Sequence, residues 1–149
     1  MNRRQFVLTT LGALALGRPA LAAPHRIEVF KSPTCGCCSA WIAHMEDAGF
    51  AVEARDVDQG RLNEVKASVG LTPELASCHT GLIEGYVIEG HVPAEDVQRL
   101  LAERPDALGL SVPGMPIGSP GMEMDGRSDA YATLLIRKDG STEVWARHG

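Results

Sequence analysis

A cluster of cysteines between a predicted strand and a predicted helix is the feature that most constrains this chain. Residues 26–30, RIEVF, are apolar and β-branched as in a strand, and KSPTCGCC follows at once. Apolar side chains then recur at helical spacing from about Cys38 to Ala48, and Gly49 stands where a helix commonly ends. The cysteines are therefore expected in the turn that opens a helix.

The rest of the chain continues the alternation of strands and helices. AVEARDV predicts a second strand, and Leu62, Val65 and Val69 predict a second helix. GLIEGYVIEG predicts one or two strands, a third helix precedes Pro105, and YATLLIR and STEVWAR flank a hairpin turn, KDG. Residues 109–126 are rich in glycine and proline and are expected to form one long loop. The order predicts an α/β fold, a thioredoxin-like sandwich with a small mixed sheet and flanking helices.

Residues 1–22 have the features of an export signal. A pair of arginines precedes a short apolar run, and the run ends in small residues suited to cleavage near Ala22. The run is too short to span a bilayer as a helix, so no membrane anchor is expected after cleavage. NRRQFVL further indicates a twin-arginine signal, and the alternative is a general secretion signal that contains two arginines. We expect residues 23–149 to form a single domain.

Charge and size exclude several roles. The formal net charge is −5, and loss of the signal would make the product more acidic. Such a protein is a poor candidate for binding nucleic acid or an anionic membrane surface. With 149 residues, of which 44% are hydrophobic, the chain can bury a core without covalent cross-links. A purely structural role for the cysteines is therefore disfavoured.

The CGCC turn itself is compatible with redox or metal chemistry. Cys35 and Cys38 have the C-x-x-C spacing of a thiol redox site, and a helix N-terminus favours the thiolate. Disulfide exchange needs only two sulfurs, so it gives no role to Cys37. Cu(I) is a soft ion that accepts several thiolate ligands, so it gives the third sulfur a role. Zinc frameworks usually present two separated cysteine pairs, and an iron–sulfur cluster would need better-spaced ligands. The sequence therefore favours Cu(I) at this turn.

Two further segments carry soft ligands. Cys78 and His79 lie side by side before a strand, where a thioredoxin-like layout would let Cys78 reach the CGCC turn. Met115, Met122 and Met124 lie in the glycine- and proline-rich loop and offer thioether sulfur, although they also suit anchoring of the loop to the core. A structural disulfide that includes Cys78 is the alternative, with the pairing left open.

The remaining residues offer no other catalytic motif, such as a phosphate-binding glycine loop, G-x-S-x-G or H-E-x-x-H. Among the other histidines, His25 and His44 are weak ligand candidates. A backbone hydrogen bond at the start of a helix is the simpler explanation for His91.

Three segments together resemble the CopG-like family of periplasmic proteins associated with copper resistance: FKSPTCGCCSAW, CHTGLIEGYVIEGHVPA and GMPIGSPGMEM. The similarity extends from about Arg26 to Trp145. It implies a thioredoxin-like periplasmic domain that binds copper, either as one ion or as several. By position, it implies ligand roles for the C-x-C-C cysteines, the C-H pair and the methionine loop: Cys35, Cys37, Cys38, Cys78, His79, Met115, Met122 and Met124.

These observations lead to one main hypothesis and two rivals. The main one is a periplasmic protein that holds Cu(I) on the cysteine cluster for buffering, transfer or redox handling of copper, with copper chaperones or exporters as candidate partners. The second is a thiol–disulfide oxidoreductase with Cys35 as nucleophile and Cys38 as resolving thiol. The third, a disulfide-stapled interaction domain, leaves the clustering of the sulfurs without a reason.

Overall fold

One mixed sheet of seven strands organises the part of the chain that the structure describes, residues 23–149 of a computed structural model. The predicted signal, residues 1–22, lies outside the described residues. The sheet order is β2-β1-β3-β4-β5-β6-β7. The strands are β1 (Arg26–Lys31), β2 (Ala51–Asp56), β3 (His79–Ile83), β4 (Tyr86–Gly90), β5 (Gly109–Val112), β6 (Tyr131–Ile136) and β7 (Thr142–His148).

The helices follow the predicted order. They are α1 (Gly36–Asp47), α2 (Gln59–Ser68), the short 3₁₀ turn η1 (Pro73–Leu75) and α3 (Ala94–Glu103). Strand β1 is parallel to β2 across α1 and antiparallel to β3, which forms a hairpin with β4. The predicted α/β class is confirmed, and this order of elements is compatible with the predicted thioredoxin-like arrangement.

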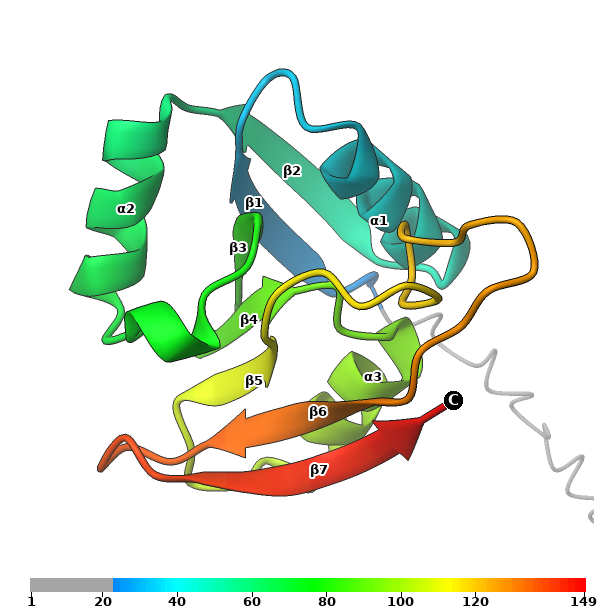
Figure 1. Cartoon of the computed structure of the whole chain (residues 1–149). Helices are drawn as coiled ribbons and strands as arrows, with labels where there is room; N and C mark the ends of the chain where they lie inside the picture. The colour runs from blue at the N-terminus through cyan, green and yellow to red at the C-terminus, as the bar shows by residue number, and fades with distance from the viewer. Residues whose placement is uncertain (1–22) are drawn as a thin grey trace, which may run out of the picture.

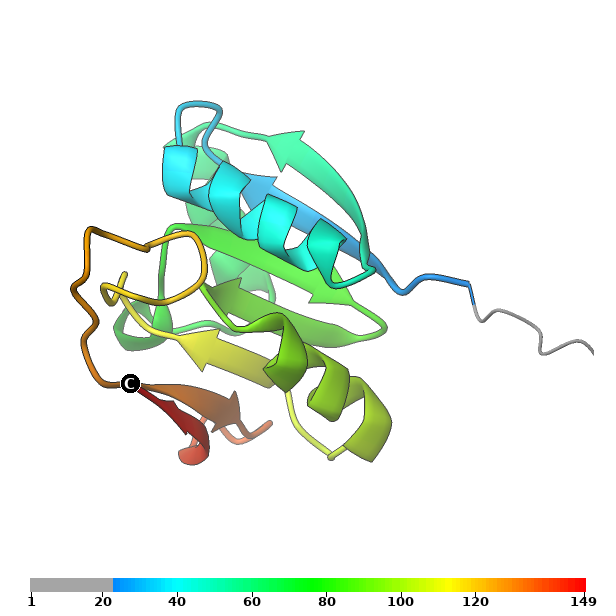
Figure 2. The ribbon, with the colours of Figure 1, turned by 90° about the vertical axis from the view of Figure 1, so that its right-hand side faces the viewer.

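The helices cover both faces of the sheet. In Figure 1, α1 and α3 lie on one side of the strands and α2 on the other, and Figure 2 shows α1 and α3 together in front. The main core joins α1 and α3 to the sheet through Trp41, Met45, Val97, Leu100 and Ile88, all fully buried. A smaller apolar cluster around Leu71 and Leu75 covers the opposite face. None of the helices within residues 23–149 is long and apolar enough to cross a membrane.

The prediction of a loop at residues 109–126 is wrong for the first four of these residues. These form β5, a fully buried strand that runs parallel to β4 and antiparallel to β6. A Cβ on Gly109 would lie 1.8 Å from the carbonyl oxygen of Val87, so the close pairing of β5 with β4 requires glycine there. Gly109, which suggested a loop in the sequence, is thus required by the close packing of β5 against β4.

Beyond β5, the chain forms the loop of residues 113–130 and then the predicted hairpin of β6 and β7. Both views show this loop, drawn yellow to orange, beside α1 (Figures 1 and 2). A Cβ on Gly121 would lie 2.7 Å from the carbonyl oxygen of Cys37 and 2.8 Å from the backbone nitrogen of Trp41. The loop therefore packs directly on the first turn of α1, where the cysteines are.

Candidate metal centre

The CGCC turn lies at the N-terminus of α1. Cys35 is the N-cap residue, and its Sγ accepts the backbone N–H of Cys38 at 3.3 Å. Cys38 is fully buried beneath the turn, whereas Cys35 and Cys37 are half-buried. Unpaired N–H groups and the helix dipole favour negative charge on sulfur at such a position. The helix begins at Gly36, slightly earlier than predicted.

The four cysteines are in two states. Cys35 and Cys38 form a disulfide, whereas Cys37 and Cys78 are thiols. The Sγ of Cys37 lies 3.5 Å from the Sγ of Cys35. The disulfide thus joins the outer pair of the C-x-x-C spacing and leaves the surplus cysteine of the turn unbonded.

Strand pairing brings Cys78 to this turn. β3 pairs with β1 so that His79 lies opposite Lys31, the last residue of β1 before the turn. Cys78 therefore faces the turn, as predicted, and its Sγ lies 3.8 Å from the Sγ of Cys37. The sulfur atoms of Cys35, Cys37, Cys38 and Cys78 all lie within 4.8 Å of one another.

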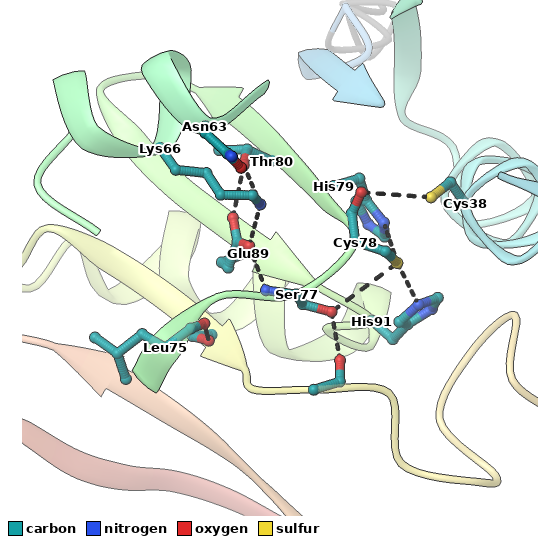
Figure 3. A network of polar contacts seen from close by, with 12 residues as sticks. Cys38, Asn63, Lys66, Leu75, Ser77, Cys78, His79, Thr80, Glu89 and His91 are labelled. Atoms are coloured by element: carbon teal, nitrogen blue, oxygen red, sulfur yellow. Dashed lines mark hydrogen bonds and ion pairs between the residues drawn. The ribbon is translucent and has the colours of Figure 1, made fainter. Parts of the chain in front are cut away.

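Two buried histidines extend the sulfur cluster. The Nδ1 of His79 lies 3.5 Å from the Sγ of Cys78, and its ring packs on Trp41 with the centroids 4.4 Å apart. The Nε2 of His91 lies 3.0 Å from the same sulfur, while its Nδ1 lies 2.8 Å from the carbonyl oxygen of Pro120. Figure 3 shows both imidazoles beside Cys78. Cys78, His79 and His91 thus form a second group with metal-ligand spacing.

His91 was missed as a ligand candidate by sequence reasoning. The expected backbone hydrogen bond is present, at Pro120, but the ring also reaches Cys78 with its other nitrogen. The signal lies in the β3–β4 hairpin, where Thr80 is opposite Glu89. If the same register is continued by two residues from the Thr80–Glu89 pair, away from the hairpin turn, Cys78 lies opposite His91. The sequence analysis left open whether this segment holds one strand or two, so the pairing could not be counted from it; with the turn at Glu84 and Gly85 known, the register gives the pair.

Burial shifts the protonation of these groups. Burial, and next the neighbouring Cys37, raise the pKa of Cys78 to about 12. Burial, followed by His91 and Lys66, lowers the pKa of His79 to about 3, and burial also lowers the pKa of His91 against the effect of the Pro120 carbonyl. At neutral pH both imidazoles are therefore uncharged with a lone pair each. Without a cation, Cys78 is a thiol, so a bound metal ion would displace its proton.

A buried ion pair supports the segment that carries Cys78 (Figure 3). The carboxylate of Glu89 contacts the Nζ of Lys66 and accepts hydrogen bonds from the Thr80 hydroxyl at 2.7 Å and the Ser77 backbone N–H at 2.6 Å. Burial raises the pKa of Glu89, and the Lys66 ammonium opposes that shift. The Ser77 hydroxyl also contacts the carbonyl oxygen of Gly114 in the methionine loop.

The methionines are only partly brought to the cysteines. The loop that carries them packs on the first turn of α1 at Gly121, as described above. The side chains of Met115 and Met124 are nevertheless 53% and 47% exposed, and Met122 is half-buried. Anchoring to the core therefore does not explain Met115 or Met124, whose side chains are about half exposed.

Comparisons with known proteins agree with the site. The model of a family described as a protein of unknown function, DUF411, matches residues 75–122, a segment that includes Cys78, His79 and His91. A solved structure of the copper resistance protein CopG, form 2, is 44% identical and covers 85% of this chain and 99% of its own, with a TM-score of 0.79. Form 1 is also 44% identical, covering 84% of this chain and 98% of its own, with a TM-score of 0.78. No curated protein sequence matches.

The identity and coverage are high enough to show a family relationship, and the cysteine cluster of this chain has the spacing of a metal site. The resemblance seen in the sequence motifs is confirmed. The chain belongs to the CopG family of copper resistance proteins.

Proposed function

We propose that the protein binds copper as Cu(I) through the thiolates of Cys35, Cys37, Cys38 and Cys78. The observation that carries the proposal is the approach of all four sulfurs to within 4.8 Å of one another at a helix N-terminus. Thiolates are soft ligands that select Cu(I), and copper resistance is the named role of the similar structures. Copper is therefore favoured over zinc as the ion that this cluster holds.

The four-sulfur site requires the reduced protein. Only thiolates are strong ligands, so the Cys35–Cys38 disulfide must open before all four sulfurs bind metal. The sulfur separations of 3.5 Å and 3.8 Å are short enough for one thiolate to bridge neighbouring ions. The cluster therefore suits more than one Cu(I) ion as well as a single one.

In the periplasm, such a site would buffer copper, transfer it or couple copper valence to the thiols. His79 is a candidate additional donor because its Nδ1 lies 3.5 Å from the Sγ of Cys78. The exposed Met115 and Met124, with Met122 between them in the sequence, offer thioethers for incoming or outgoing Cu(I). A copper chaperone or exporter is the class of partner that would use this loop.

The decisive experiment is a Cu(I) titration of the fully reduced protein against a competing chelator, without oxygen. We expect at least one equivalent of Cu(I) to be held against the chelator. Weak or substoichiometric binding by a folded, fully reduced sample would overturn the proposal.

A thiol–disulfide oxidoreductase is the second candidate function. The observation in its favour is the disulfide between Cys35 and Cys38, with Cys35 at the N-cap position of α1. In that reaction the Cys35 thiolate would attack a substrate disulfide, and Cys38 would then release the reduced substrate and form the Cys35–Cys38 disulfide. Efficient reduction of a test disulfide together with weak Cu(I) binding would favour this function over the first.

A further inference from the structure

The penultimate residue, His148, contacts a buried carboxylate on α3. Its Nε2 lies 2.9 Å from the Oδ2 of Asp96 and 3.2 Å from the Oγ1 of Thr133, which donates a hydrogen bond to the same carboxylate oxygen. An ionised carboxylate can only accept hydrogen bonds, so Nε2 carries a proton in this contact. The side chains of His148 and Asp96 are 16% and 7% exposed, so water competes little for the pair.

Carboxylates outnumber cations around this imidazole. The Tyr131 ring stacks on His148 with the centroids 4.7 Å apart, and the charges of Asp96, Glu95 and Glu123 add to burial in raising the pKa of Tyr131 to about 12. Each of these negative charges attracts an imidazolium. The charged and titratable groups of the surrounding elements α3, β6, β7 and the loop of residues 113–130 are Glu95, Asp96, Arg99, Glu123, Tyr131, Arg147 and the C-terminal carboxylate of Gly149.

The contact lies where the loop of residues 113–130 enters β6. Figures 1 and 2 both show the C-terminus beside this point. Tyr131, the first residue of β6, is the partner of His148 in the sheet. Two residues earlier, the backbone N–H of Asp129 donates to the carbonyl oxygen of Ile117 at 2.9 Å and joins the two limbs of the loop. His148 therefore holds the loop close to the point where its limbs meet.

The same loop covers the first turn of α1. Gly121 packs on the carbonyl oxygen of Cys37, and the carbonyl oxygen of Pro120 accepts a hydrogen bond from the imidazole of His91. Loosening of the loop where it enters β6 would give Gly121 room to move away from Cys37. The contact at His148 thus bears on how the cysteine turn is covered.

Protonation strengthens the contact between His148 and Asp96. An imidazolium adds a full charge to the hydrogen bond, and charge-assisted hydrogen bonds are about twice as strong as neutral ones. A neutral imidazole retains the hydrogen bond without the charge. The closed contact therefore binds the proton more tightly than the open one, so acid favours the closed loop and rising pH favours opening.

We propose that His148 is a pH-sensitive latch on the loop of residues 113–130. When His148 is protonated, its pairing with Asp96 holds the loop on α1. Loss of the proton loosens the loop and uncovers Cys37. The latch itself needs no metal, whereas its use in controlling access to copper rests on the function proposed above.

The test follows exchange of the Asp129 backbone N–H with deuterium by NMR, in metal-free protein with the Cys35–Cys38 disulfide closed. Each rate is divided by the rate of an unstructured chain at the same pH, which removes the intrinsic effect of pH on exchange. Between pH 5.5 and pH 7.5, where histidine changes its charge, the protection of this N–H should fall at least about threefold. Constant protection across this range would overturn the latch.

Variants assign the pH dependence to the latch. His148→Gln retains a hydrogen-bond donor without a charge, so protection of the Asp129 N–H should be the same at both pH values. Asp96→Asn removes the counter-charge and should also give a flat profile. His25→Gln is the matched control and should keep the wild-type profile, because His25 pairs with Glu84 at the β3–β4 turn. If Asp96→Asn fails to fold, His148→Gln decides.

The outcomes separate the latch from the proposed function. A pH dependence that persists in His148→Gln would overturn the latch. In copper-loaded protein, transfer of Cu(I) to a chelator should accelerate from pH 5.5 to pH 7.5 more in the wild type than in His148→Gln. An equal acceleration in both proteins would overturn control of the copper site by the latch. Failure to bind Cu(I) would overturn the proposed function and leave the latch, which is measured without metal, standing.

Discussion

The carboxylate of Glu89 accepts the backbone N–H of Ser77 at 2.6 Å, one residue before Cys78. The same carboxylate contacts the Nζ of Lys66, and it is fully buried in the sheet. The ion pair thereby fixes the backbone from which Cys78 approaches the CGCC turn. A buried charge inside the sheet thus supports a sulfur site at the ends of strands β1 and β3.

Glu89→Gln should destabilise the protein by about 3 kcal/mol or more. Glutamine keeps the shape of the side chain but leaves the Lys66 ammonium buried without its counter-charge. Urea unfolding at pH 7 measures the loss. The double variant Lys66→Met/Glu89→Gln should recover part of it, because no buried charge is then left unpaired. Wild-type stability in Glu89→Gln would show that the pair is not ionised.

His79 should make the metal-free disulfide form less stable as the pH falls. Its pKa is lowered to about 3 in the fold, so between pH 6.5 and pH 3 the unfolded chain binds a proton that the folded protein does not. The stability is therefore complete above pH 6.5 and decreases below it, by up to about 1.4 kcal/mol per pH unit. The measurement is urea unfolding between pH 7 and pH 5.

His79→Gln provides the control for that slope, since glutamine does not titrate. The difference between the free energies of unfolding of the two proteins should be constant above pH 6.5 and should shrink from pH 6.5 to pH 5. Parallel curves for the wild type and His79→Gln would mean that His79 is not buried in its neutral form.

Cys37→Ser should separate copper binding from disulfide exchange. The variant retains Cys35 and Cys38, which form the disulfide, so reduction of a test disulfide should continue at a similar rate. Cu(I) affinity or stoichiometry should fall, because Cys37 lies between Cys35 and Cys78 at 3.5 Å and 3.8 Å. Chelator competition and a thiol-exchange assay on the same sample measure both properties. Unchanged copper binding would argue against a multi-sulfur site.

Gly121→Ala should lift the methionine loop from α1. Alanine there would place a Cβ 2.7 Å from the carbonyl oxygen of Cys37, in addition to the strain of a φ of +85°. Gly126→Ala is a matched control, with a φ of +66° and no atom within 4 Å of the added Cβ. We expect Gly126→Ala to cost about 1 kcal/mol and Gly121→Ala about 2 kcal/mol more, measured by urea unfolding. Equal costs would show that the loop does not pack on α1.

Met115→Leu and Met124→Leu should alter copper handling without altering the fold. Both side chains are about half exposed and lie outside the core, so the free energy of unfolding should stay within about 0.5 kcal/mol of the wild type. If their thioethers bind Cu(I), the double variant should release copper to a chelator faster than the wild type. Stopped-flow transfer measures the rate, and an unchanged rate would exclude a role for these two sulfurs in release.

The sequence by itself determined the order of the elements and the chemistry of the CGCC turn. Strand β1, helix α1 and the β6–β7 hairpin follow from local signals: apolar spacing, a terminating glycine and the KDG turn. The ability to bind a soft metal ion likewise depends on residue type. The sequence alone therefore identified the candidate ligands Cys35, Cys37, Cys38 and Cys78. Strand β5 escaped because its four residues are too few to predict a strand and run directly into the glycine- and proline-rich loop, and because they are held by their neighbours in the sheet.

Only the tertiary structure decided which side chains meet at the sulfurs. The disulfide between Cys35 and Cys38 was one of several pairings left open, and contact between Cys78 and His91 depends on the register of β3 and β4. The role of Pro120 as acceptor for His91 arises because the loop of residues 113–130 folds back over α1. Such contacts join residues far apart in the chain, and their geometry comes from packing, which no local pattern of residues encodes.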